Sequence, residues 1–174
     1  TTNHHQKRQL VELAIQRLTR RLNQPVSKIH PLTLWAGLGD PMQGAVAALA
    51  LGASRTVGVL LAGGTQMLAV YRLMVAIAQA NQLSWEPSRV VVGTTRWVTD
   101  DPTGDTLGLA RAIDAPLLTS ELSFAASRHP QLQAYEAGFV KEGVGAGGCA
   151  IAAYLHQGWG QQELLAAVEA LLDP

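Results

Sequence analysis

The fold is decided by residues 56–66, which read Thr56-Val57-Gly58-Val59-Leu60-Leu61-Ala62-Gly63-Gly64-Thr65-Gln66. The first part, 56–61, is a nearly continuous apolar run, which predicts a strand buried on both faces of a parallel sheet. A glycine turn at 62–65 follows, and 66–80 then has the length and apolar spacing of a helix. A strand, a tight turn and a long helix in this order predict a βαβ unit.

The same alternation extends over the rest of the chain. Further strands are predicted at 32–38, 89–92 and 116–119. Helices are predicted at 6–22, 42–51, 106–113, 130–139, 149–156 and 161–172. We expect Asp40 to be the N-cap of the helix at 42–51, with Pro41 in its first turn and Gly52 at its end. The sequence therefore predicts one α/β domain over 1–174, Rossmann-like and three-layered, with helices on both sides of a mostly parallel sheet.

Length and composition exclude several classes of protein. The chain has 174 residues, of which 48% are hydrophobic and 15% charged, and this suits a folded domain and excludes disorder. No apolar run reaches the roughly 18 residues of a membrane span and nothing resembles a signal peptide, so we expect a cytoplasmic protein. A single cysteine, Cys149, excludes an internal disulfide and a thiolate zinc site, and we expect its thiol to be packed and inert.

Charge is balanced overall but segregated along the chain. Thirteen basic and thirteen acidic side chains cancel, which favours neither nucleic acid nor a membrane surface as a partner. Residues 1–30 hold six basic side chains and one acidic one, whereas residues 100–174 hold ten acidic and three basic ones. We interpret the basic segment as the solvated face of a helix.

Ligands of parallel α/β sheets bind beyond the carboxyl ends of the strands, which selects the loops at 37–41, 62–66, 93–101 and from 120 onward. Because successive parallel strands end on the same side, we expect the turns after 56–61 and 89–92 to share one edge of the sheet. The candidate ligand contacts there are Gly63, Gly64, Thr65, Thr94, Thr95 and Arg96. Hydroxyls and a guanidinium suit phosphate or carboxylate, although an arginine at a strand end can also be purely structural.

A glycine-rich run at 143–148 matches the spacing GxGxxG through Gly143, Gly145 and Gly148. A dinucleotide site needs a strand directly before this motif, and none is predicted, so a Rossmann-type oxidoreductase is disfavoured. Two interpretations stay open: the backbone N–H groups of the run bind an anion, or the glycines only allow close helix packing. Glu142, beside the run, is a candidate general base.

Residues 141–148 read Lys141-Glu142-Gly143-Val144-Gly145-Ala146-Gly147-Gly148. This run resembles the Gly-Glu-Gly-(Ser/Thr)-Gly-Ala signature of nicotinate-nucleotide–dimethylbenzimidazole phosphoribosyltransferases, and most closely their divergent, provisionally named branch. The order of the segments 38–43, 59–65 and 90–96 is also similar, so the resemblance covers essentially the whole chain. Family members are longer, and the resemblance implies that this chain is the C-terminal part of such a protein.

The resemblance implies a homodimeric enzyme that needs neither metal nor cofactor. It would transfer the phosphoribosyl group of nicotinate mononucleotide to a benzimidazole-type base, giving the α-ribotide of the cobalamin lower ligand. Glu142 would be the general base, and the N–H groups of Gly143, Gly145 and Gly147 would hold phosphate or carboxylate. Val144 replaces the hydroxyl residue of the signature, and 94–96 differs from the better-known branch. The alternative is a non-catalytic nucleotide- or corrinoid-pathway binding protein with the same fold.

Overall fold

The computed structural model describes residues 4–138 and 144–173, which form two compact units. The first unit contains 4–57 and 69–87, and the second contains 58–68 and 88–173. The α/β class with a parallel sheet is confirmed, and the sheet lies in the second unit.

The first unit is helical. Its elements are α1 (His4–Leu22), a 3-10 turn (Val26–Lys28), α2 (Pro31–Leu38), α3 (Pro41–Ser54) and most of α4 (Thr65–Asn81). Its buried large side chains include Leu18, Ile29, Leu51, Val70, Tyr71, Met74 and Ile77. The predicted helices at 6–22, 42–51 and 66–80 are confirmed.

The predicted strand at 32–38 is wrong, because these residues form α2. A short apolar run fits a buried strand or a helix equally well, and here the helix start decides. His30 Nδ1 accepts a hydrogen bond from the Leu32 N–H at 3.3 Å, and Pro31 occupies the first helical position.

The start of α3 is as predicted and its end is not. Asp40 Oδ1 accepts the Met42 N–H at 2.8 Å, and Gln43 Oε1 accepts the Asp40 N–H at 3.5 Å, which completes a capping box. Gly52 does not end the helix, which continues to Ser54. The buried Ser54 hydroxyl donates to the Leu51 carbonyl at 2.9 Å and helps to close the last turn.

The second unit is built on three parallel strands in the order β1-β2-β3. They are β1 (Val59–Ala62), β2 (Val90–Thr95) and β3 (Leu117–Ser120), and the other elements are a 3-10 turn (Pro87–Arg89), α5 (Arg96–Thr99), α6 (Thr106–Ala112), α7 (Pro130–Glu136), α8 (Gly145–Gln157) and α9 (Gln161–Ala170). The predicted strands at 56–61, 89–92 and 116–119 are confirmed, with ends shifted by one to three residues.

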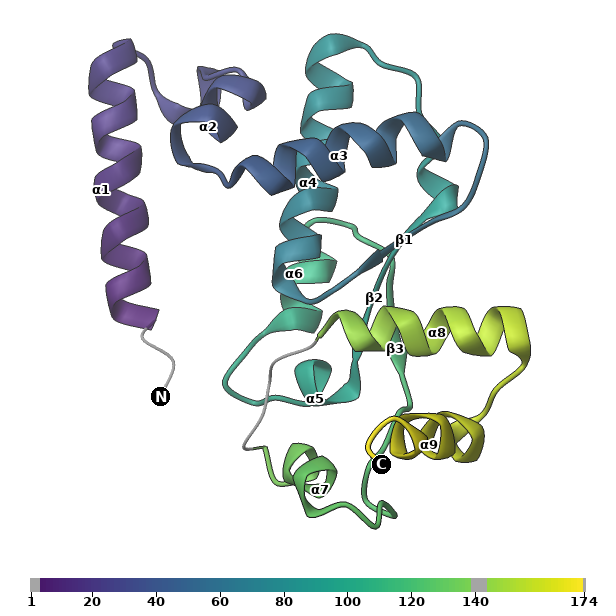
Figure 1. Cartoon of the computed structure of the whole chain (residues 1–174). Coiled ribbons are helices and arrows are strands. Elements are labelled where there is room, and N and C mark those ends of the chain that lie inside the picture. The colour runs from purple at the N-terminus through teal and green to yellow at the C-terminus, as the bar shows by residue number, and fades with distance from the viewer. Residues whose placement is uncertain (1–3, 139–143, 174) are drawn as a thin grey trace. The chain divides into compact units, whose positions relative to one another are not determined.

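One helix, α8, lies across the three strands and contacts each of them (Figure 1). It begins at Gly145, four residues before the predicted start, so the last glycines of the run at 143–148 are helical. Cys149 is exposed, and the expectation of a packed thiol is therefore wrong, because this residue lies on the side of α8 away from the buried glycines Gly147 and Gly148.

Candidate functional site

The turns after β1 and β2 share one edge of the sheet, as predicted. Ala62 and Gly93 are register partners, and the Gly63 N–H continues the ladder by donating to the Gly93 carbonyl at 2.8 Å. A Cβ placed on Gly64 would lie 3.9 Å from Thr94 Oγ1. The two predicted contact segments, 63–65 and 94–95, are therefore direct neighbours.

Helix α4 begins at this edge. Its first residue, Thr65, is exposed, while Gly63 and Gly64 are buried. The Gly64 carbonyl accepts the N–H groups of Met67 and Leu68, at 2.9 and 3.2 Å, so the first N–H groups of the helix, at Thr65 and Gln66, have no acceptor within the helix. Such a helix start attracts anions.

The Thr94 side chain at this edge is completely buried, and its hydroxyl has no hydrogen-bond partner among the described residues. Its neighbour Thr95 is also buried, with 3% of its surface exposed. A buried hydroxyl without a partner costs about 1–3 kcal/mol, so such groups mark places where a ligand or water is expected.

The start of α8 reaches the same edge from the other end of the chain. A Cβ on Gly145 would lie 3.7 Å from the Ala62 carbonyl, an ordinary contact. A Cβ on Gly147 would lie 2.1 Å from the Thr94 carbonyl carbon, and one on Gly148 would lie 2.8 Å from the Ala62 Cα. Close helix packing, one of the two interpretations left open, is therefore an observed role of Gly147 and Gly148.

Glu142 and Gly143 lie outside the described residues, and so does Lys141. Their roles in the site stay predictions. The seven other predicted glycine and threonine contacts lie at the sheet edge, with Thr65 exposed, namely Gly63, Gly64, Thr65, Thr94, Thr95, Gly145 and Gly147.

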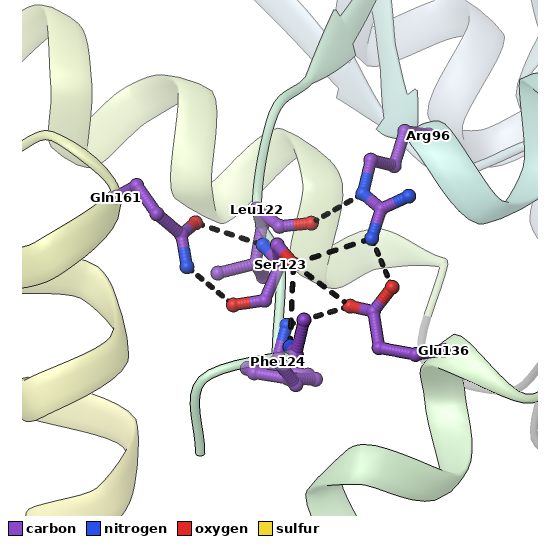
Figure 2. Close-up of polar contacts among 7 residues, drawn as sticks. Arg96, Leu122, Ser123, Phe124, Glu136 and Gln161 are labelled. Carbon is purple, nitrogen blue, oxygen red and sulfur yellow. Dashed lines mark hydrogen bonds and ion pairs between the residues drawn. The ribbon is translucent and has the colours of Figure 1, made fainter.

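The side chain of Arg96 is held in a polar cluster that the sequence did not reveal. Arg96 forms an ion pair with Glu136 of α7, and its Nε donates to the Leu122 carbonyl at 3.2 Å. Its Nη2 also lies 3.3 Å from Ser123 Oγ. Figure 2 shows Arg96 and Glu136 on one side of Ser123 and Gln161 of α9 on the other. We call Arg96, Ser123, Glu136 and Gln161 the arginine cluster.

Most polar groups of the arginine cluster have hydrogen-bond partners within the cluster or on the neighbouring backbone. Glu136 Oε1 accepts the Phe124 N–H at 2.6 Å and the Ser123 hydroxyl at 3.1 Å. Gln161 Oε1 accepts the Ser123 N–H at 2.8 Å, and its Nε2 donates to the Ser123 carbonyl. The cluster therefore joins α5, α7 and α9 through the segment after β3. Binding of a ligand anion by Arg96 stays a prediction.

Two carboxylates of this unit have lowered pKa values. Burial raises the pKa of Glu136, but hydrogen bonds from the Phe124 N–H, Arg96 and Ser123 outweigh it, so this pKa lies below its ordinary value. Hydrogen bonds from the Ser127 hydroxyl, at 2.6 Å, and the Arg128 N–H, at 2.8 Å, lower the pKa of Glu169. Each of these carboxylates lies on a helix, Glu136 on α7 and Glu169 on α9, and accepts hydrogen bonds from the segment between β3 and α7.

Sequence reasoning missed Glu136, Ser123 and Gln161. Glu136 lies 40 positions after Arg96, and Gln161 lies 38 positions after Ser123, so no local spacing indicates these contacts. Over the described ranges, no group of three or more His, Cys, Asp or Glu side chains is placed to hold a metal ion. None of the helices in that part of the chain has the length and hydrophobicity to span a bilayer.

Comparison with known proteins finds close relatives. The chain is 63% identical over 171 residues to the UPF0284 protein of Cyanothece sp. (strain PCC 7425), covering 98% of this chain and 45% of the relative. It is 56% identical over 172 residues to the UPF0284 protein of Acaryochloris marina, covering 98% of this chain and 46% of the relative. The Nostoc sp. (strain PCC 7120) UPF0284 protein is 52% identical over 183 residues, with 96% and 48% covered.

The chain spans about half the length of these relatives. No family model matches it. The name UPF0284 states no activity.

Proposed function

We propose that this chain, which is similar to UPF0284 proteins, is the nucleotide-binding part of a phosphoribosyltransferase. The substrate would be nicotinate mononucleotide, and the acceptor a benzimidazole-type base. One observation carries the proposal: α4 and α8 begin at the same sheet edge, α4 on the side of the buried Thr94 hydroxyl and α8 against the Thr94 backbone. The first N–H groups of a helix have no acceptor within the helix, and the helix start carries partial positive charge, so both starts suit a 5′-phosphate or a nicotinate carboxylate.

The glycines at this edge support the same class of ligand. Gly64 and Gly145 carry no side chain that could shield the N–H groups at the starts of α4 and α8 from a phosphate. The exposed Thr65 adds a hydroxyl at the start of α4. This geometry suits an anion without requiring a metal ion.

The reaction class rests on the resemblance at 141–148. In nicotinate mononucleotide the bond from C1′ of the ribose to the pyridinium nitrogen is already activated. A ring nitrogen of the acceptor base would attack C1′ while that bond breaks and nicotinate leaves with the bonding electron pair. Glu142 would take the proton from the other nitrogen of the acceptor, which keeps the product neutral at its base. The product is an α-ribotide, and the proposal includes a homodimer in the cytoplasm.

The test is release of nicotinate. The whole protein that contains this chain is incubated with nicotinate mononucleotide and 5,6-dimethylbenzimidazole, and free nicotinate and the α-ribotide are measured by chromatography. Stoichiometric formation of both supports the proposal. Binding of the nucleotide without turnover would instead support the non-catalytic binding protein, and absence of binding would contradict both.

Glu142→Gln separates a proton acceptor from a structural side chain. The amide keeps the shape but cannot accept the proton, so turnover should fall by about 10²–10⁴ while nucleotide binding is retained. Glu12→Gln, at an exposed position in the other unit, is the control and should keep the parent rate. A Glu142→Gln variant with the parent rate would remove Glu142 from the mechanism.

A further inference from the structure

The second unit also contains a cleft of about 420 Å³ beside β3. We call it the β3 cleft, and its walls include Leu118, Ser120, Ile151, Tyr154, Trp159 and Leu164. The residues come from β3, from the second half of α8, and from the start of α9 and the turn before it. Its volume lies within the range of about 300–1,000 Å³ that is typical of small-molecule sites.

Ser120 contributes a hydroxyl to the wall of the cleft. Ser120 is 5% exposed, and its Oγ has no hydrogen-bond partner among the described residues. Side chains alternate along a strand, so Ser120 and Leu118 project from the same face of β3. Leu118 is the register partner of Gly93 on β2, and partners in a parallel sheet project from the same face. A Cβ on Gly93 would lie 3.1 Å from Ile151 and 3.3 Å from Gly148, both in α8, so Leu118 and Ser120 are on the face that α8 covers. The hydroxyl therefore points into the space under α8.

The remaining walls of the cleft are apolar and aromatic. Ile151 and Leu164 lie inside, while Tyr154 and Trp159 at the mouth are 61% and 37% exposed. Exposed aromatic rings beside a buried apolar floor offer stacking surface to a flat ligand. Glu121 brings a carboxylate, and the described residues that line the cleft include no basic side chain, so a ligand anion is disfavoured.

We propose that the β3 cleft binds a flat, uncharged aromatic molecule that carries one hydroxyl or N–H group. The ring lies between the apolar floor and the rings of Tyr154 and Trp159, and its polar group pairs with Ser120 Oγ. The buried Ser120 hydroxyl gains a hydrogen-bond partner when this ligand binds, so a ligand with a hydroxyl or N–H group should bind more tightly than a purely apolar one. The walls of the β3 cleft include none of the predicted contacts at the glycine edge, although Ser120 pairs with Thr95 across the sheet, and the proposal does not depend on phosphoribosyl transfer.

The test is a titration of the ¹⁵N-labelled 174-residue chain with 2-naphthol, followed by two-dimensional NMR. We expect saturable shifts confined to 118–122, 150–155 and 159–164. The matched anion 2-naphthoate should bind at least about tenfold more weakly, because the Glu121 carboxylate repels it.

Variants decide whether Ser120 is the polar partner. Ser120→Ala should weaken 2-naphthol binding about three- to tenfold, the range of one net hydrogen bond, while Thr56→Ala, an exposed hydroxyl of the other unit, should leave it unchanged. Tyr154→Ser, at a mostly exposed position, should also weaken binding without unfolding the chain.

Several outcomes would overturn the proposal. These are no saturable shifts at millimolar naphthol, shifts scattered over the chain, equal binding of naphthoate, or unchanged affinity in Ser120→Ala. Shifts in the cleft that depend on protein concentration alone would show instead that the β3 cleft is an interface between copies of the chain.

Discussion

At its first turn α8 touches the backbone of β1 and β2, whereas its second half lines a cleft of about 420 Å³ together with β3 and the start of α9. Gly147 and Gly148 bring the helix against Thr94 and Ala62, while Tyr154 and Leu155 on the later turns are largely exposed. One helix thus fixes the sheet edge at one end and provides apolar surface for a ligand at the other.

The largest effect is expected at the closed end of α8. Gly147→Ala places a Cβ 2.1 Å from the Thr94 carbonyl carbon, so either the helix or the strand must move. We expect the free energy of unfolding to fall by about 3 kcal/mol or more, measured by urea denaturation. An unchanged urea midpoint would show that α8 does not sit on β2 as described.

A smaller loss is expected in the arginine cluster. Glu136→Gln removes the negative charge opposite Arg96 but keeps an acceptor for the Phe124 N–H. Because both side chains are partly exposed, at 32% and 21%, we expect a loss of about 1–2 kcal/mol in the free energy of unfolding. The exposed Glu121→Gln is the matched control and should unfold like the parent. If both variants unfold at the same urea concentration, the arginine cluster does not stabilise the fold.

Acid should weaken the second unit through the same carboxylates. Glu136 and Glu169 have pKa values below the ordinary 4.5, so the unfolded chain binds more protons than the folded one as pH falls through this region. Their stabilising contribution is present above pH 4.5 and is lost as the pH falls through the lower folded pKa values. Urea denaturation from about pH 6 to about pH 3 should show this loss, and Glu136→Gln should lose less than the parent. An identical pH dependence would contradict the lowered pKa of Glu136.

The smallest effect should have the opposite sign. Gly52 lies inside α3, and a Cβ there would have no atom within 4 Å. Gly52→Ala should therefore stabilise the chain by about 0.5–1 kcal/mol, because alanine loses less backbone entropy on folding. A destabilised Gly52→Ala would mean that the helix does not continue through this position.

The sequence predicted those parts of the fold that depend on local patterns. Continuous apolar runs located β1 and β2, and the Asp40-Pro41 pair located the start of α3. The run at 32–38 was assigned to the wrong class because eight residues or fewer of apolar sequence do not distinguish strand from helix.

The sequence predicted correctly those parts of the candidate site that follow from strand topology alone. Parallel strands end on one side, so the order of strands and helices along the chain is enough to group Gly63, Gly64, Thr94 and Thr95. The partner of Arg96 could not be predicted, because Glu136 is brought to it by the path of the chain after β3 and not by sequence spacing. The packing role of Gly147 is likewise visible only where Thr94 lies against it.

Calorimetry with nicotinate mononucleotide tests the central claim, that the edge where α4 and α8 begin binds a nucleotide anion. Gly145→Asp is the variant to compare, because its Cβ fits at 3.7 Å from the Ala62 carbonyl and an acidic residue favours a helix start. The account predicts saturable binding to the parent chain and binding at least about tenfold weaker in Gly145→Asp, with the fold retained, since the new carboxylate repels the phosphate. Equal affinity of the two proteins, or no binding to the parent chain, would contradict it.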